Sequence, residues 1–323
     1  MSAQRTYSHL GGQARDLPSE YAIVTSRLHY YTGRGFEVNV PLGDWYRTHQ
    51  TESPLQCRDW DAFVDPRQTT YTKYTRIQRE REAEVAARFD AIEATGYDRQ
   101  LSAEWLDALG ASLPALRYPC HALQMIAAYV GQMAPSGRVT LAAAFQAADE
   151  LRRVEGLARR LRQLQLVRPE IGGDAQRVWQ DDPRWQPLRK VMEQLLVTYD
   201  FGEAFVALNL CVKPILDELI GVEWAFLAMA NSDRELAGWL TSVREDTLWH
   251  RSWSAALMRL VIADRPGNRP VLGAWSSKWF AAAFQAVDAL APYYTEDPDR
   301  AMLRIINAHH AYLGEIGIEG ITP

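Results

Sequence analysis

The chain has 323 residues, 47% of them hydrophobic, and a formal net charge of −5 at pH 7. This length is enough for one large domain or two, with a sizeable core. Without a basic excess there is no surplus positive charge to neutralise phosphates, which argues against nucleic acid as the main partner.

The sequence carries no mark of export or of a membrane span. Its three cysteines, Cys57, Cys120 and Cys211, lie far apart and form no CxxC motif, which fits a reducing cytosol. The first residues, MSAQRTYSHLGG, lack the apolar core of a signal peptide. The most apolar stretch, Phe205–Ala230, is interrupted by charged residues, so it predicts buried helices instead of a membrane helix. We expect a cytoplasmic protein with no membrane partner.

The first sixty or so residues differ from the rest of the chain. Gly and Pro are scattered through them, helical periodicity is weak, and the alternating FEVNV at residues 36–40 predicts one short strand. So long a segment with little regular structure is unusual inside a compact domain. We therefore predict an extended N-terminal arm, residues 1–61, that lies on a partner's surface. Its candidate interface residues are Tyr30, Tyr31, Trp45 and Tyr46.

From Asp65 onward, helix signals dominate. Asp-Pro pairs at residues 65–66, 182–183 and 297–298 each place a capping carboxylate before a proline, and Ser232 with Glu235 forms a possible capping box. The stretch 187–230 must be broken, and Pro214 is the expected kink. The predicted fold class is all-α, with residues 62–323 forming a bundle of long helices. Helical patterns cover residues 70–94, 115–133, 140–166, 187–230, 234–263, 272–290 and 298–313.

The stretch AADELRRVEGL, residues 147–157, contains half of a metal-site pattern. Carboxylate-bridged diiron sites use a Glu and a His three residues apart on each of two helices. Glu150 is present, but the residue three later is Arg153. Glu150 shares a helical stripe with Val154, Leu157 and Leu161, an apolar face where an unpaired carboxylate would be costly. The spacing alone therefore favours a buried or half-buried ion pair between Glu150 and Arg153.

A complementary half pattern lies in REDTLWHRSW. It contains His250, with Thr247 three residues earlier. His250 shares a stripe with Trp253, Leu257 and Leu260, so it faces inward and, on its own, is typical of a core histidine. No Glu-x-x-His motif occurs anywhere in the chain. A site with four carboxylates and two histidines therefore cannot be assembled in the usual way.

Other motifs give weaker signals. The adjacent His309 and His310 near Glu315 point in different directions on a helix and are more typical of a solvated helix end. No Walker pattern or GxGxxG is present, and no nucleophile–base arrangement is legible. We assign no catalytic and no cofactor-binding residue to this chain.

Several long stretches of the sequence, which follow one another in a characteristic order, are similar to those of a known family. The chain resembles the β subunit of the hydroxylase of bacterial multicomponent monooxygenases, nearest the toluene and alkene branch. The strings that carry the resemblance are RTYSHL (5–10), PSEYAIVTSRLHYYT (18–32), DWDAFVDPRQTTYTKYT (59–75), LRYPCHALQMIAAYVGQMAPSG (116–137), YDFGEAFVALNLCVKP (199–214) and HRSWSAALMRL (250–260).

The resemblance implies a ferritin-like helical fold shared with the catalytic α subunit of the same complex. Where that subunit has Asp-Glu-Ile-Arg-His, this chain has DELRR, with Arg153 at the His position. Thr247 stands at the position of the second Glu, and His250 matches the second His. The resemblance therefore implies that Glu150, Arg153, Thr247 and His250 are relics of a site that holds no metal. A guanidinium beside Glu150 supplies positive charge that iron would have supplied.

The resemblance also implies a function. The chain would be a non-catalytic structural β subunit in an (αβγ)2 hydroxylase, with diiron in the α subunit. An effector protein, a Rieske ferredoxin and a reductase would complete a system that uses O2 and NADH-derived electrons. Its substrate would be a small hydrocarbon such as toluene or an alkene, which it hydroxylates or epoxidises. The alternatives are a stand-alone ferritin-like metalloenzyme, which the missing Glu-x-x-His motifs count against, and a helical binding protein unconnected to oxygen chemistry.

Overall fold

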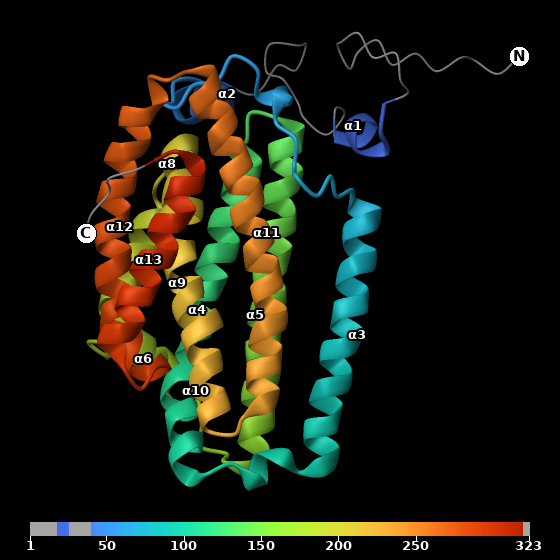
Figure 1. The fold of residues 1–323 in the computed structure, drawn as a ribbon, viewed down its shortest axis with the longest axis vertical. Helices are drawn as coiled ribbons and strands as arrows, with labels where there is room; N and C mark the ends of the chain where they lie inside the picture. The colour runs from blue at the N-terminus through green and yellow to red at the C-terminus, as the bar shows by residue number, and fades with distance from the viewer. Residues whose placement is uncertain (1–17, 26–39, 319–323) are drawn as a thin grey trace, which may run out of the picture.

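The computed structural model describes residues 18–25 and 40–318. All regular structure within these ranges is helical, which confirms the all-α prediction, and the long helices run roughly along one axis (Figure 1). The α-helices are α1 (Glu20–Thr25), α2 (Val40–Tyr46), α3 (Tyr71–Thr95), α4 (Ala103–Met133), α5 (Gly137–Val167), α6 (Ala175–Asp181), α7 (Gln186–Leu196), α8 (Phe201–Val206), α9 (Lys213–Glu218), α10 (Trp224–Ala230), α11 (Arg234–Asp264), α12 (Asn268–Tyr294) and α13 (Pro298–Ile316).

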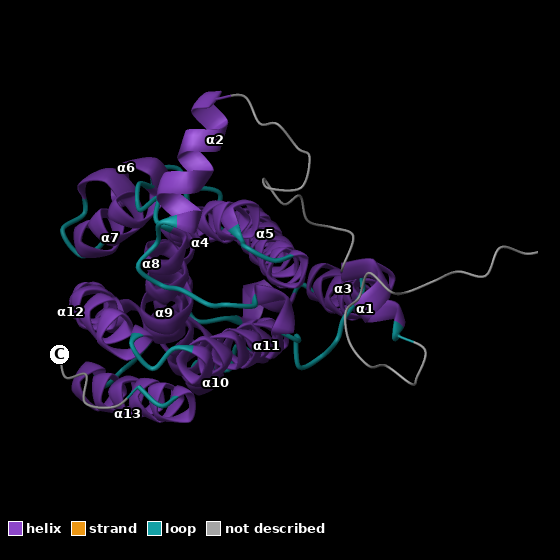
Figure 2. Ribbon diagram, turned by 90° about the horizontal axis from the view of Figure 1, so that it is seen from above, coloured by secondary structure: helices purple, strands orange, loops and turns teal. Residues whose placement is uncertain are grey.

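Four long segments form the centre of the molecule: α4, α5, the run from α8 to α10, and α11 (Figure 1, Figure 2). Helices α4 and α5 pack against each other along their length as a hairpin. Ser102 and Ser136 cap their N-termini, since each side chain accepts a hydrogen bond from a backbone N–H of the first turn. Gly131 permits the close packing, because a Cβ there would lie 3.3 Å from the Cβ of Ala143.

The run from α8 to α10 is continuous, and two π-helical turns, Ala207–Val212 and Leu219–Glu223, join its parts. The prediction that the helix breaks at Pro214 is therefore wrong. The chain instead breaks at residues 197–200, before Asp200 caps α8 by accepting from the N–H of Glu203. Because Pro214 has no N–H, carbonyls of the preceding turn lose their helical donor. His309 on α13 donates from Nε2 to the carbonyl of Leu210 over 2.6 Å.

The predicted helix starts at Asp-Pro pairs are confirmed only at Asp297, whose side chain accepts from the first turn of α13. At Asp65 and Asp182 the side chain accepts from the backbone N–H two residues later, that of Arg67 and Arg184 respectively. These are local Asx turns, and no helix begins there.

The predicted capping box at Ser232 and Glu235 is also wrong. Asp233 caps α11 by accepting from the N–H of Leu236. Ser232 instead has a left-handed φ of 63° in the turn before the helix. The carboxylate of Glu235 pairs with Arg88 on α3 at 3.0 Å, so it is not available to cap.

Helix α3 lies on the outside of the bundle, beside α5 and α11, and α12 and α13 cover the opposite side (Figure 2). Only four of its residues, Gln78, Val85, Phe89 and Ile92, are buried, and charged pairs supply further contacts with the bundle. The charged pairs that join it to α5 and α11 are Arg81–Glu245, Arg81–Asp246, Arg88–Glu235, Glu82–Arg152 and Asp90–Arg159.

The described part of the predicted arm contains helix, namely α1, α2 and the π-helical turn Arg47–Thr51. Of the predicted strand, residues 36–39 lie outside the described residues, and Val40 begins α2. Gln50 donates to the carbonyls of Met133 and Ala134 at the end of α4, and Leu55 is buried against the bundle. The boundary between residues 61 and 62 stays a prediction.

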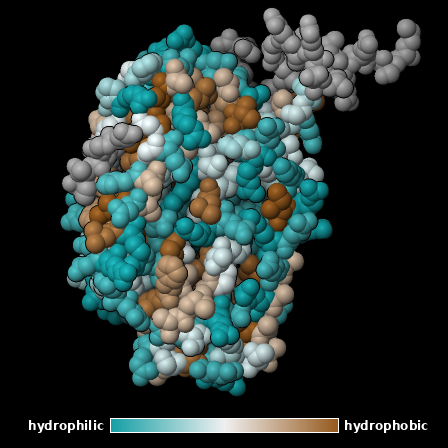
Figure 3. Space-filling view, in the orientation of Figure 1, coloured by the Kyte–Doolittle hydropathy of each residue, from teal (hydrophilic) through white to brown (hydrophobic). Residues whose placement is uncertain are grey.

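The outer surface is mostly hydrophilic, and apolar side chains form small separate patches on the face shown in Figure 3. Across the described ranges no helix combines the length and the apolar character that crossing a membrane requires.

Candidate functional site

A cluster of four charged side chains lies in the core between α5 and α9. Lys213 Nζ is 2.5 Å from Glu150 Oε1 and 2.8 Å from Asp217 Oδ2. Arg153 is 3.4 Å from Glu150 Oε2 and donates to Asp217 Oδ1 over 2.9 Å. No side chain of the four is more than 5% exposed. We call these residues the core ion cluster; its two carboxylates and two cations balance each other.

The charges of the core ion cluster stabilise one another against the cost of burial. Desolvation alone would raise the pKa of Asp217, but Lys213 and Arg153 outweigh it and hold this pKa well below its usual range. Desolvation opposes the charge of Arg153, but Glu150 and Asp217 raise its pKa above the ordinary value. Burial raises the pKa of the neighbouring Cys120 thiol to about 12, so it stays protonated at neutral pH. The cluster is therefore a charge-balanced ionic network with a thiol beside it.

His250 on α11 lies next to this cluster. Its Nε2 is 3.0 Å from Asp149 Oδ2, and its Nδ1 is 3.9 Å from Glu150 Oε1. Desolvation first, and then the charge of Lys213, lower the pKa of His250 to about 3. Desolvation raises the pKa of Asp149 to about 6, while hydrogen bonds from Tyr74 and Gln78 hold it down. At neutral pH a neutral imidazole therefore faces an ionised Asp149.

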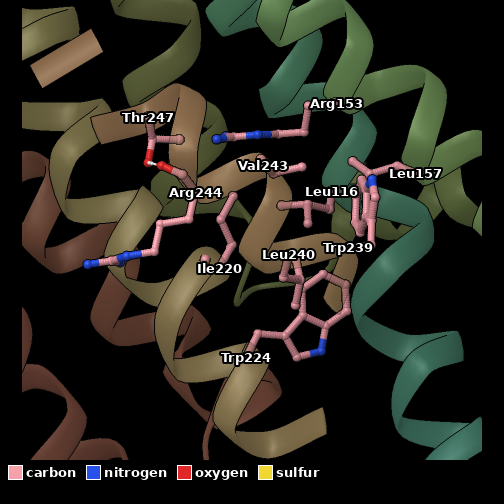
Figure 4. Close-up of a pocket in the computed structure, with 11 residues that line it drawn as sticks. Leu116, Arg153, Leu157, Ile220, Trp224, Trp239, Leu240, Val243, Arg244 and Thr247 are labelled. Atoms are coloured by element: carbon pink, nitrogen blue, oxygen red, sulfur yellow. Dashed lines mark hydrogen bonds between the residues drawn. The ribbon is translucent and has the colours of Figure 1, made fainter. Parts of the chain in front are cut away.

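Thr247, which is predicted to be a relic of a metal site, is not a member of the core ion cluster. Its hydroxyl donates to the carbonyl of Arg244 on its own helix over 2.9 Å. Thr247 and Arg153 lie at one end of a pocket, and Trp224 lies at the other (Figure 4). The rest of the lining is mainly apolar and comes from α4, α5, α11 and the turn before α10: Leu116, Leu157, Ile220, Gly221, Trp239, Leu240, Val243 and Arg244.

Comparison with known proteins shows which family this helical architecture is found in. The family described as methane/phenol/alkene hydroxylase matches residues 45–265. The hydroxylase component subunit beta of the toluene-4-monooxygenase system of Ectopseudomonas mendocina is 36% identical, over 91% of this chain and 91% of that protein. The oxygenase component DmpL of phenol 2-monooxygenase from Pseudomonas sp. strain CF600 is 26% identical, over 89% of this chain and 87% of that protein.

A solved structure agrees with these sequence matches. The structure of toluene 4-monooxygenase with toluene bound in its resting active site contains a chain that superposes with a TM-score of 0.85 at 36% identity. The match covers 90% of this chain and 97% of that one. The chain belongs to the methane/phenol/alkene hydroxylase family. The predicted resemblance to hydroxylase β subunits, the predicted bundle fold and the predicted place in a multicomponent monooxygenase are thereby confirmed.

Diiron proteins of this helical type hold their metal with a Glu from each of two helices and a Glu-x-x-His from each of the other two. In the core of this chain, Cys120 from α4, Lys213 from α9 and Arg153 from α5 lie together beside Glu150. A site whose carboxylates are already neutralised by two buried cations does not fit a pair of iron ions. No group of three His, Cys, Asp or Glu side chains in the described ranges is placed to hold a metal ion.

Reasoning from the sequence found Glu150, Arg153 and His250, which the structure brings together, but it missed Lys213 and Asp217. Both belong to the charged residues that interrupt the most apolar stretch. A signal was present, since a Lys and an Asp four residues apart in an otherwise apolar helix form a pair on one face. Buried charges are almost always paired, so this pair needed partners from another helix.

Two of the four predicted interface residues lie within the described ranges. Trp45 is half-buried and contacts the ring of Tyr199, with 4.9 Å between ring centroids. Tyr46 donates from its hydroxyl to the carbonyl of Gln132 over 3.4 Å. Tyr30 and Tyr31 fall outside the described residues. Their role at an interface stays a prediction.

Proposed function

We propose that this chain is the non-catalytic β subunit of a hydroxylase whose dinuclear iron centre lies in a partner α subunit. The observation that carries the proposal is the core ion cluster, in which Lys213 and Arg153 neutralise the carboxylates that a metal would otherwise need. The relic interpretation of Glu150, Arg153, Thr247 and His250 accounts for this arrangement, because both cations lie beside Glu150.

The proposed complex is an (αβγ)2 hydroxylase, and this chain packs against α and helps to hold the two halves together. It works in the cytoplasm with an effector protein, a Rieske ferredoxin and a reductase. The reaction inserts oxygen from O2 into a small hydrocarbon such as toluene or an alkene, with electrons from NADH. The similarity to a hydroxylase β subunit of a toluene monooxygenase supports this substrate class. This chain contributes no group to the reacting atoms.

Metal analysis of the purified chain, alone and in complex with its α and γ subunits, tests the proposal. We expect no stoichiometric iron in the isolated chain and iron in the complex. Omitting the chain from co-expression is expected to abolish both assembly, measured by size-exclusion chromatography, and toluene oxidation. Two iron ions per isolated chain, or an α subunit that is fully active without this chain, would overturn it.

A further inference from the structure

A row of Trp and Tyr rings runs from α6, where Trp179 is half-buried, to the start of α10. Each ring contacts the next, and the distances between neighbouring ring centroids are 5.2 to 6.4 Å. The innermost ring, Trp224, lies at one end of the pocket in Figure 4. We call these rings the aromatic row; in spatial order they are Tyr118, Trp179, Trp185, Tyr293, Tyr294 and Trp224.

Packing alone does not account for the Trp side chains of the aromatic row. Trp185 and Trp224 are fully buried, and the Nε1 of neither has a hydrogen-bond partner within the described ranges. A buried N–H without an acceptor lowers stability, so an apolar ring would suit packing better. Trp and Tyr differ from Phe in another property, because they give up one electron far more readily. A second run of rings lacks this continuity, since two Phe rings separate Trp60 from Trp253.

Tyr293 is the member of the row that can lose a proton together with an electron. Its hydroxyl donates to Asp182 Oδ2 over 3.0 Å, within reach for proton transfer to the carboxylate. The other oxygen of Asp182 accepts from the backbone N–H of Arg184, which fixes the carboxylate in place. The guanidinium of Arg184 lies 4.9 Å from the centre of the Tyr293 ring, so a positive charge on this ring is unfavourable. Tyr294 instead donates to the carbonyl of Ser112, which is not a base, so Tyr294 can pass charge but cannot retain it.

We propose that the aromatic row conducts oxidising equivalents to Tyr293 and thereby protects the core of this chain from one-electron oxidants. The oxidant class is a peroxyl radical, which gains one electron from the row and one proton from water and becomes a hydroperoxide. The electron leaves Tyr293, its phenolic proton passes to Asp182, and a neutral tyrosyl radical remains. A thiol then returns one hydrogen atom to Tyr293, and Asp182 releases its proton to water. The inference goes beyond the proposed function and does not depend on it.

A photo-oxidant attached beside Trp179 tests this inference in the full chain. The side chain of Arg177 is 72% exposed and precedes Trp179 by two residues, so Arg177→Cys provides an attachment point for a ruthenium polypyridyl complex. The three native cysteines are buried and should not be labelled. After a laser flash in the presence of an electron acceptor, transient absorption and EPR spectroscopy should detect a neutral tyrosyl radical. Tyr293→Phe should abolish this signal.

Further variants of the labelled chain test the path and the proton acceptor. Trp185→Phe interrupts the aromatic row and should largely abolish the tyrosyl signal, whereas Trp60→Phe lies outside the row and should leave it unchanged. Asp182→Asn removes the proton acceptor and should slow radical formation by about a hundredfold. Its matched control is Asp174→Asn, which changes a carboxylate that is 54% exposed and pairs with Arg177, and it should have no effect.

The inference is overturned if the tyrosyl signal persists in Tyr293→Phe, or if Trp185→Phe and Trp60→Phe give equal yields of the radical. Equal rates of radical formation in Asp182→Asn and the labelled parent chain would also contradict it. If Trp185→Phe does not fold, the variants of Tyr293 and Asp182 decide alone, because both leave the packing of the rings intact. None of these results bears on iron content or subunit assembly, which test the proposed function.

Discussion

At the residue scale, Arg153 links the two carboxylates of the core ion cluster. Replacing it with Leu leaves Glu150 and Asp217 with only Lys213 between them. We expect Arg153→Leu to lower the free energy of unfolding by about 3–5 kcal/mol, because a buried charge is left uncompensated. The double variant Glu150→Gln with Arg153→Leu should be less destabilised, since Asp217 and Lys213 remain a balanced pair 2.8 Å apart. Urea unfolding of the two variants and the wild type measures the difference.

A matched control for this comparison is Arg159→Leu on the same helix. Arg159 pairs with Asp90 at 2.6 Å, but the two side chains are 40% and 74% exposed. Solvent screens such a pair, so its loss should cost no more than about 1 kcal/mol. If Arg153→Leu is as mild as Arg159→Leu, the core ion cluster does not have the buried character described above.

Asp149 and His250 have opposite effects on stability as the pH changes. The folded-state pKa of Asp149 is raised from 3.8 to about 6, so its contribution to stability is full below pH 3.8 and is lost as the pH rises to 6. The pKa of His250 is lowered from 6.5 to about 3, so its contribution is full above pH 6.5 and is lost as the pH falls. Between pH 4 and 6 the two slopes cancel.

The Asp149→Asn variant should reveal the slope of His250 alone. Relative to the wild type, its free energy of unfolding should fall by about 1.4 kcal/mol for each pH unit between pH 6 and pH 4. Urea unfolding at pH 4, 5 and 6 gives the two profiles, and effects of all other groups cancel in their difference. Parallel profiles for variant and wild type would show that Asp149 does not take up a proton in this range.

At the element scale, the π-helical turn before α9 depends on α13. Pro214 supplies no N–H to this turn, and His309 donates to the carbonyl of Leu210 over 2.6 Å. His309→Phe should therefore cost about 1–3 kcal/mol in the free energy of unfolding, the penalty for an unsatisfied buried acceptor. In a Pro214→Ala background the same change should cost less, because the new backbone N–H supplies a donor. Chemical unfolding of the four proteins completes the double-mutant cycle, and additive effects would contradict the coupling.

The sequence predicts the long helices well where capping and periodicity agree. The patterns at residues 234–263 and 298–313 correspond to α11 and α13, which end only one and three residues later. Errors arise because an Asp that precedes Pro can act in two ways. Asp182 forms an Asx turn, whereas Asp297 caps a helix. The first half of α4 went unpredicted, and Pro114 inside this helix explains why a local rule fails there.

The candidate site is predictable only in part, for a related reason. The spacing of Glu150 and Arg153 indicates an ion pair, and the structure contains one at 3.4 Å. The tighter contacts come from Lys213 and Asp217, which are distant in sequence and reach Glu150 and Arg153 only once α9 takes its place in the bundle. Likewise, His309 finds its acceptor because α13 packs beside Pro214. Such contacts are set by tertiary packing, which single-sequence periodicity does not contain.

At the scale of the whole molecule, the end of the bundle near α2 is the candidate for contact with another subunit. Trp45 packs on Tyr199 there, and the nearby Leu42 and Val197 are exposed by 45% and 60%. We expect Trp45→Ala to weaken binding to the α subunit by tenfold or more, because buried Trp side chains dominate binding energy. Isothermal titration calorimetry of the purified subunits measures it. Tyr71→Ala, which changes an aromatic on α3 that is 68% exposed, is the control.

The two outcomes of that comparison have separate meanings. A loss confined to Trp45→Ala supports the aromatic end of the bundle as an interface. Equal binding by wild type and Trp45→Ala, with unchanged melting temperatures, would contradict this role. A fall in melting temperature without a change in binding would show that Trp45 only stabilises the contact with Tyr199.

The core ion cluster also restricts the order in which this protein can acquire its shape. Helix α5 leaves the ribosome before α9, so Glu150 and Arg153 exist as nascent chain while Lys213 and Asp217 are still to be added. Withdrawing either ion pair from water alone would cost its full desolvation without the contacts that the other pair supplies. The hairpin of α4 and α5 can collapse early, but its inner face must stay wet until α9 docks. Exclusion of water from the core is therefore a late and cooperative step of folding. A truncated chain that ends before α9 cannot complete this step.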